Sequence, residues 1–231
     1  MTIGNTKESL AERKVYRDGD IKLNVRQYNL LIGGLLLWGF LLNFLTVHFL
    51  GDKVISFAQN GGSLVIIIGY IVSAILGIVL VHRDNPVTTF IGYNLIAVPV
   101  GILLCVTLAG YDASIIGTAA LITAGITAVF MVAASIKPQI FLSMGKVLFI
   151  GLIVLIVGEL LTVIIFRSSR MDLIFAWLGA GLFSLYIGFD WARCNVCACT
   201  VNNAVAAAAN LYLDIINLFL RILSILGKRR D

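Results

Sequence analysis

The stretch that decides the fold is NLYLDIINLFLRILSILG, residues 210–227. This stretch and the residues just before it carry polar side chains at intervals of seven, four, three and four residues: Asn203, Asn210, Asp214, Asn217 and Arg221. Side chains at that spacing share one face of an α-helix. Lipid does not solvate such a face, so we expect this helix to lie inside a bundle with the other helices around it. The alternative is a stripe of interhelical hydrogen bonds with no role in transport.

The whole chain has the composition of an integral membrane protein. Its 231 residues are 60% hydrophobic and only 13% charged, and the mean hydropathy is +1.01. Soluble domains carry about 25% charged residues, so an ordinary soluble domain is excluded. The formal charge of +5 comes from basic residues beside the apolar runs, and no basic, aromatic-laced face is present to bind phosphates. We therefore expect a lipid bilayer around the protein and no nucleic-acid partner.

Seven apolar runs are each long enough to cross a bilayer as a helix. They cover roughly residues 28–50, 62–82, 88–109, 112–135, 143–166, 171–191 and 203–226. Gly, Pro or charged residues separate them at GDK (51–53), HRDNP (82–86), GYD (110–112), IKP (136–138), RSSR (167–170) and WARCN (191–195). Such residues punctuate helices. The sequence predicts an all-α, polytopic membrane protein of seven transmembrane helices, six of them surrounding the C-terminal one.

Three parts follow along the chain: a polar segment (1–27), a seven-helix transmembrane domain (28–227) and a basic tail (228–231). Lys and Arg are enriched on the cytoplasmic side of membrane proteins. The polar segment holds six of them, and the loops expected on its side hold Arg83, Lys137, Lys146 and Arg193. We therefore expect a cytoplasmic amino terminus. Seven spans would then place the basic tail outside, unless the last segment enters the membrane and returns.

Two carboxylic acids lie in the last two apolar runs, Asp190 in YIGFDW and Asp214 in NLYLDIINLFL. A carboxylate in hydrocarbon costs on the order of 2.5–3.5 kcal/mol on insertion scales, so such residues face the bundle interior, water, a partner or an ion. An antiparallel connection through residues 192–202 would bring both to a similar depth. The sequence therefore predicts one shared site.

A pair of buried carboxyl groups can share a proton or bind a cation. Two carboxyls that share one proton titrate as a unit, and the proton couples their charge to the separation of the helices that carry them. Carboxylate oxygens are also hard ligands that suit calcium, although two carboxylates with water make a weak site. We expect a weak calcium site at Asp190 and Asp214. The alternative is that both residues only anchor helices through hydrogen bonds.

The terminal NLYLDIINLFLRILSILG resembles the ending of the Bax inhibitor-1, or transmembrane Bax inhibitor motif, family. FSLYIGFDWARC resembles the aspartate motif of the same family, and GYNLIAVPVGI and SIKPQIFLSMGKVL fit its pattern in order. The resemblance implies six helices around the last one, and an aspartate pair that senses pH and gates a slow calcium leak. By motif, the pair is Asp190 and Asp214, and Arg83 is the arginine that can hold one of them. Some members carry an acidic residue in the second helix, which GSLVIIIGYIVSAILGIVLV lacks.

Glu159, in VLIVGELLTV, is a third acid within an apolar run. It either lines a path through the bundle or pairs with Thr162 or a hydroxyl of a neighbouring helix. With Asn210, Asn217 and Arg221 it forms a secondary polar set beside the aspartate pair.

Three cysteines, Cys194, Cys197 and Cys199, crowd the loop after Asp190. They could bind a soft metal or form a disulfide, but a structural zinc site needs four ligands. A reduced cytoplasmic loop is the favoured interpretation. No Gly-rich phosphate loop, catalytic triad or HExxH motif is present, so we expect no enzyme and no cofactor beyond calcium as a permeant ion.

The resulting hypothesis is a pH-sensitive calcium leak channel, with calcium and protons as its ligands. The alternative is a regulator that conducts nothing and binds another membrane protein, such as a membrane protease. The short amino terminus favours a bacterial plasma membrane over that of the endoplasmic reticulum.

Overall fold

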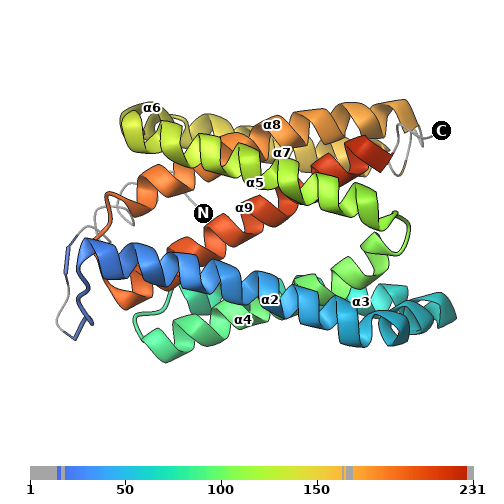
Figure 1. The fold of residues 1–231 in the computed structure, drawn as a ribbon, viewed down its shortest axis with the longest axis horizontal. Coiled ribbons are helices and arrows are strands. Elements are labelled where there is room, and N and C mark those ends of the chain that lie inside the picture. The colour runs from blue at the N-terminus through green and yellow to red at the C-terminus, as the bar shows by residue number, and fades with distance from the viewer. Residues whose placement is uncertain (1–14, 17–18, 163, 165–168, 228–231) are drawn as a thin grey trace. The chain divides into compact units, whose positions relative to one another are not determined.

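A computed structural model of the chain describes residues 15–16, 19–162, 164 and 169–227. The described part is all-α, apart from one isolated bridge between Lys22 and Thr200. Its α-helices, labelled in Figure 1, are α2 (Val25–Phe57), α3 (Ser63–Val81), α4 (Pro86–Leu108), α5 (Ala113–Ile136), α6 (Pro138–Ser143), α7 (Gly145–Leu161), α8 (Ser169–Cys194) and α9 (Val201–Gly227). A π-helical segment, η1 (Ala58–Gly62), joins α2 to α3. The tail 228–231, most of the segment 1–27 and the first two residues of RSSR (167–168) lie outside the described residues.

The predicted seven long helices are present among the described residues, and the six-residue α6 is an addition that the sequence did not predict. Within the described part of the chain, five helical segments are long and apolar enough to cross a membrane. One of them, Val25–Val81, contains two of the predicted spans, and the described part of α7 is only 17 residues long. An all-α, polytopic membrane protein is therefore confirmed.

The helix boundaries follow local chemistry. Asn85 caps α4, since its Oδ1 accepts from the N–H of Val87 at 2.9 Å and of Thr88 at 3.3 Å. Pro86 occupies the first helical position, where a missing N–H costs nothing. Asn24 and Gln27 form a capping box at the start of α2. The predicted break at HRDNP is thus confirmed.

The predicted break at GDK (51–53) is wrong, because α2 continues through these residues to Phe57. The chain turns instead at Asn60 and Gly61, and Gly61 has φ of 94°. Glycine adopts that left-handed conformation without the steric cost that a Cβ brings, whereas a single glycine inside a helix costs only about 1 kcal/mol. The same reasoning explains why α8 runs on through WARCN to Cys194, where no residue requires a turn.

The described residues form two compact units. One comprises the residues up to Gly110 together with Val196–Asn210, and the other comprises Tyr111–Asn195 and the residues from Leu211 onward. α9 contributes its first ten residues to the first unit and the remainder to the second.

In the first unit, α4 packs against α2 and α3. α3 and α4 cross at two glycines: a Cβ on Gly92 would lie 2.6 Å from the backbone nitrogen of Val81 and 2.8 Å from the carbonyl oxygen of Gly77. Backbones that approach so closely gain van der Waals contact, which replaces the hydrophobic effect as the packing force between helices in lipid.

Pro99 lies inside α4 and cannot donate a hydrogen bond to the carbonyl of Leu95. The hydroxyl of Ser73, on α3, donates to that carbonyl at 2.7 Å. A neighbouring helix thus satisfies the backbone group that the proline frees, as membrane helices require.

In the second unit, the seam between α7 and α8 is built from glycines and large side chains. A Cβ on Gly145 would lie 2.9 Å from the ring of Phe189, and a Cβ on Gly158 would lie 2.4 Å from the ring of Phe175. Between them, Gly151 faces Leu182 at 3.0 Å. Each of these α8 side chains is seven residues from the next, so one ridge of α8 fills a groove of α7.

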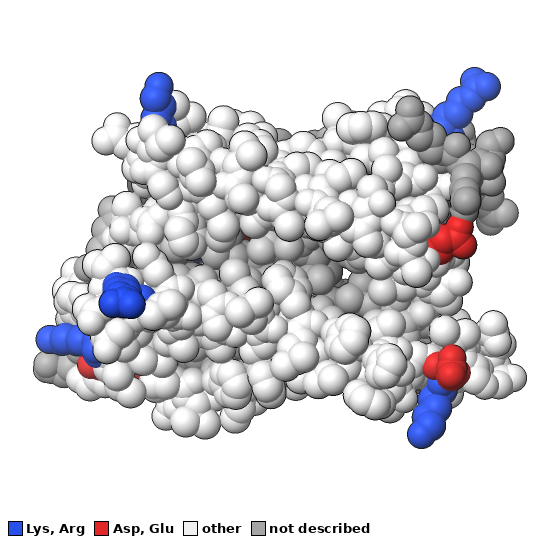
Figure 2. All heavy atoms as spheres, viewed as in Figure 1, with Lys and Arg blue, Asp and Glu red and all other residues white. Residues whose placement is uncertain are grey.

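The surface matches a membrane environment. Many large apolar side chains of α2, α3, α5 and α7 are exposed, among them Leu37, Ile68, Leu121 and Val147. Almost all charged side chains on the face shown in Figure 2 lie near helix ends. α9 differs from these helices, because every one of its residues is buried or half-buried.

Candidate functional site

The candidate site is an aspartate pair within the second unit. α8 positions Asp190 one turn before its C-terminal end, and α9 positions Asp214 at its middle. The two carboxyl groups are close enough to interact electrostatically with each other. Two buried carboxylates at such a distance repel each other, and a proton or a cation between them would relieve the repulsion.

The two members of the pair have different surroundings. The Asp214 residue is 8% exposed, and its Oδ2 atom is buried with no hydrogen-bond partner among the described residues. The Asp190 side chain is 11% exposed, and its Oδ1 atom lies 3.8 Å from Nη1 of Arg193, one turn further along α8. Asp190 therefore has a cation beside it, and Asp214 offers an oxygen open to a proton or a cation.

Tyr186 is a third member of this site. It precedes Asp190 by four residues on α8, a spacing that brings side chains together on one helix face. Its phenol interacts electrostatically with both carboxyls. Its ring lies between those of Phe183 and Phe189, with centroids 6.3 and 6.5 Å away. Tyr186 and Arg193 were not among the predicted site residues. Their spacing of four and three residues from Asp190 on one predicted helix could have identified both.

Arg83 lies in the turn between α3 and α4, in the first unit, and its side chain is exposed. Its backbone is held in place, since its carbonyl accepts from the Thr89 hydroxyl at 3.0 Å. The amide of Asn202, in the first turn of α9, donates to the carbonyl of Asp84 in the same turn. The predicted latch between Arg83 and an aspartate stays a prediction.

The polar stripe of α9 lies on one continuous helix. The Asn203 amide donates to the carbonyl of Ala198 at 2.9 Å, and the Asn217 amide donates to that of Leu213 at 2.8 Å. Asn210 is half-buried, as is Arg221. Asn203 and Asn217 thus bond to backbone carbonyls in or just before α9. Arg221 instead contacts a side chain of another helix, α7.

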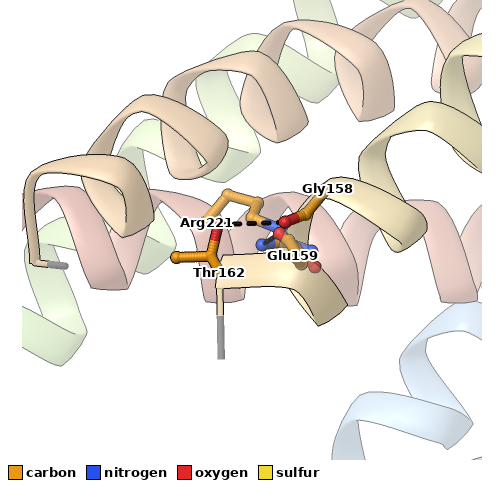
Figure 3. A network of polar contacts seen from close by, with 4 residues as sticks. All are labelled: Gly158, Glu159, Thr162 and Arg221. Carbon is orange, nitrogen blue, oxygen red and sulfur yellow. Dashed lines mark hydrogen bonds and ion pairs between the residues drawn. The ribbon is translucent and has the colours of Figure 1, made fainter. Parts of the chain in front are cut away.

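Glu159 pairs with Arg221, as Figure 3 shows. The two guanidinium nitrogens of Arg221 each donate to one carboxylate oxygen, with Nη2 2.9 Å from Oε2. The suggested pairing of Glu159 with Thr162 is wrong, because the Thr162 hydroxyl donates to the Gly158 carbonyl at 2.9 Å. A threonine in a helix commonly bonds to the carbonyl four residues earlier.

The predicted cysteine cluster lies at the end of α8 and in the connection between α8 and α9. Cys194 is buried at the end of α8, where its thiol donates to the Trp191 carbonyl at 3.1 Å. Cys197 and Cys199 are half-buried. No group of three or more His, Cys, Asp or Glu side chains able to hold a metal occurs among the residues that the structure describes.

Comparison with known proteins adds a family match. Residues 23–231 match the family described as "Inhibitor of apoptosis-promoting Bax1". An uncharacterized protein of Helicobacter pylori is 40% identical over 85 residues, which are 37% of this chain and 36% of the relative. Protein Cj0236c of Campylobacter jejuni is 41% identical over 86 residues, 37% of this chain and 36% of its own length. "Bax inhibitor 1" of Saccharomyces cerevisiae is 38% identical over 81 residues, 33% of this chain and 27% of the yeast protein. The matched region thus spans little more than a third of these bacterial relatives.

Proposed function

The chain belongs to the Bax inhibitor-1 family, and from this membership and its buried aspartate pair we propose that it is a pH-sensitive calcium leak channel. The observation that carries the proposal is the placement of Asp190 and Asp214, two largely buried carboxyls on consecutive apolar helices that are close enough to interact electrostatically. A pair of acids inside membrane helices is costly to maintain and marks ion and proton pathways in membrane proteins.

The proposed switch is a competition for the same oxygens. A shared proton holds α8 and α9 together, and its loss leaves two carboxylates that repel each other. Calcium then takes the place of the proton, since carboxylate oxygens are its usual ligands and two of them hold it weakly. The buried Oδ2 of Asp214 supports this assignment, because it is an acceptor that no described donor satisfies. Lower pH should therefore weaken calcium binding.

The arrangement of six helices around α9 belongs to the same proposal. Its support is the burial of α9, in which no residue is exposed although the helix carries Asn, Asp and Arg. The role of Arg83 as a competitor for one carboxylate is supported by the sequence resemblance alone. Arg193 is the cation that the structure places beside Asp190.

Calcium flux into liposomes that contain the purified protein tests the proposal. We expect uptake above that of protein-free liposomes and a rate that changes between neutral and acidic pH. A protein that is folded by circular dichroism and yet passes no calcium at either pH would contradict the proposal. The non-conducting regulator would then be the remaining hypothesis, and co-purification with a membrane protease would be its test.

Topology is a separate expectation, in which the amino terminus and the WARCN loop both face the cytoplasm of a bacterial cell. Backbone bonds hold the amino-terminal segment beside the residues that lead into α9: the Leu23 N–H donates to the Cys199 carbonyl at 2.8 Å, and the Val201 N–H donates to the Ile21 carbonyl at 3.1 Å. In a variant that keeps Cys197 as its sole cysteine, we expect no labelling of intact cells by a membrane-impermeant thiol reagent, and labelling once cells are permeabilised.

A cysteine at Gly110 provides the matched control, because this residue is exposed in the turn before α5 and has open space around it. The Gly110→Cys variant without the natural cysteines should label in intact cells. Labelling of Cys197 from outside, with Gly110→Cys protected, would invert the orientation.

A further inference from the structure

The Glu159–Arg221 ion pair sits in a site that is shaped for it. A Cβ on Gly179 of α8 would lie 2.9 Å from both Cδ and Nε of Arg221, so the glycine leaves the space through which the arginine side chain passes. The guanidinium then lies 6.0 Å from the centre of the Phe183 ring. Three helices of the second unit thus fix one charge: α9 supplies the arginine, α7 the carboxylate, and α8 the slot and the ring.

This ion pair lies in line with the aspartate pair. Residues 214 and 221 are seven apart on α9, which corresponds to about 10 Å along the helix axis and to nearly the same face. Asn217 lies between them on that face. The side chains of Arg221 and Glu159 retain exposed fractions of 23% and 30%, so both are partly accessible. A cation that moves along the polar stripe from Asp214 towards the end of α9 would meet the guanidinium next.

We propose that the Glu159–Arg221 pair is the charge barrier that limits cation passage between the aspartate pair and the C-terminal end of α9, an inference that rests on the proposed channel function. Arg221 alone would place a fixed positive charge on the stripe and repel calcium. Glu159 neutralises this charge through two hydrogen bonds. Because the two terminal guanidinium nitrogens match the two carboxylate oxygens, the ion pair has one fixed geometry. The pair therefore lets cations pass slowly instead of excluding them.

Glutamine substitutions separate a charge effect from a packing effect. Glu159→Gln leaves the arginine uncompensated, so the initial rate of calcium uptake should fall. Arg221→Gln leaves the glutamate uncompensated, so the rate should rise. A unit charge and a doubly charged calcium ion about 10 Å apart in an effective dielectric of about 20 change a binding equilibrium by on the order of a hundredfold, which is the largest effect on the rate that we expect in each direction. The double variant should lie between the two single variants.

Conservative variants and a distant charge complete the experiment. Arg221→Lys keeps the charge but loses the fork, so it should change the rate less than Arg221→Gln does. Lys146→Gln, an exposed position at the start of α7, should leave the rate unchanged. Should one single variant fail to fold, the other single variant still carries one uncompensated charge, and its comparison with the double variant, which carries none, reports the charge dependence.

The outcomes distinguish the two proposals. Wild-type protein that passes no calcium overturns the channel and this barrier together. Wild-type protein that conducts, with both single variants shifted in the same direction or neither shifted, overturns the barrier alone. A lower rate for Glu159→Gln together with a higher rate for Arg221→Gln supports the barrier, and the reverse pair of shifts overturns it.

Discussion

Replacement of Asp190 or Asp214 by asparagine is expected to abolish the pH dependence of calcium flux. Asparagine has nearly the same shape and still forms hydrogen bonds, but it cannot take up or release a proton in this range. In the proposed switch the two interacting carboxyls share one proton, so either substitution removes the shared titration. The measurement is the initial rate of calcium uptake by proteoliposomes, taken across a series of pH values.

The double variant should change the pH profile little more than either single variant does. Residues that act as one unit are not additive, whereas independent sites are. Asp172→Asn, at the start of the same helix α8, is the matched control and should retain the wild-type profile. Single variants that both keep the wild-type profile would remove the aspartates from the mechanism, and additive effects would show that they titrate independently.

Gly92→Ala is expected to destabilise the protein more than any other single methyl group discussed above. The added Cβ would lie 2.6 Å from a backbone nitrogen and 2.8 Å from a backbone oxygen of α3, and backbone atoms cannot move aside as a side chain can. Overpacking of this kind costs about 1–3 kcal/mol. Thermal unfolding in detergent, followed by circular dichroism, should show a lower midpoint temperature.

Gly69→Ala is the control for helix propensity, because it lies in α3 with nothing within 4 Å of the added methyl group. Alanine is favoured over glycine in a helix by about 1 kcal/mol, so this variant should be as stable as wild type or more so. Equal midpoints for Gly92→Ala and Gly69→Ala would show that the crossing of α3 and α4 tolerates a wider separation than the structure has.

The sequence predicted the helices well because membrane spans leave a strong, local signal. Length, hydropathy and the residues of HRDNP, GYD and IKP located the ends of α3, α4 and α5 within a few residues. The predicted break at GDK is wrong because neither a charged residue nor a glycine ends a helix by itself. A helix accommodates Gly51, Asp52 and Lys53 without any change of φ and ψ, whereas the positive φ of Gly61 does require a turn.

Contacts between helices were harder to predict. Both aspartates could be placed at one depth from the length of the connection between α8 and α9, because that argument needs only the chain direction. The partner of Glu159 could not be chosen in this way, because Arg221 is 62 residues further along the chain. The slot at Gly179 explains the choice, and a glycine in the sequence does not reveal which side chain it admits. Tyr186 and Arg193 could have been predicted, because they lie four and three residues from Asp190 on the same helix.

The division of α9 between the two compact units has a consequence for biosynthesis. Every other described helix precedes α9 in the chain, so all of them are synthesised before α9, which contributes residues to both units. The first unit lacks residues 201–210 until then, and the second lacks Asp214 of the aspartate pair and the arginine that pairs with Glu159. During this interval Asp190 and Glu159 are inserted without these partners. Assembly of both units therefore ends with the same event, the arrival of the least lipid-like helix, and a ribosome that stalls before residue 201 leaves neither unit complete.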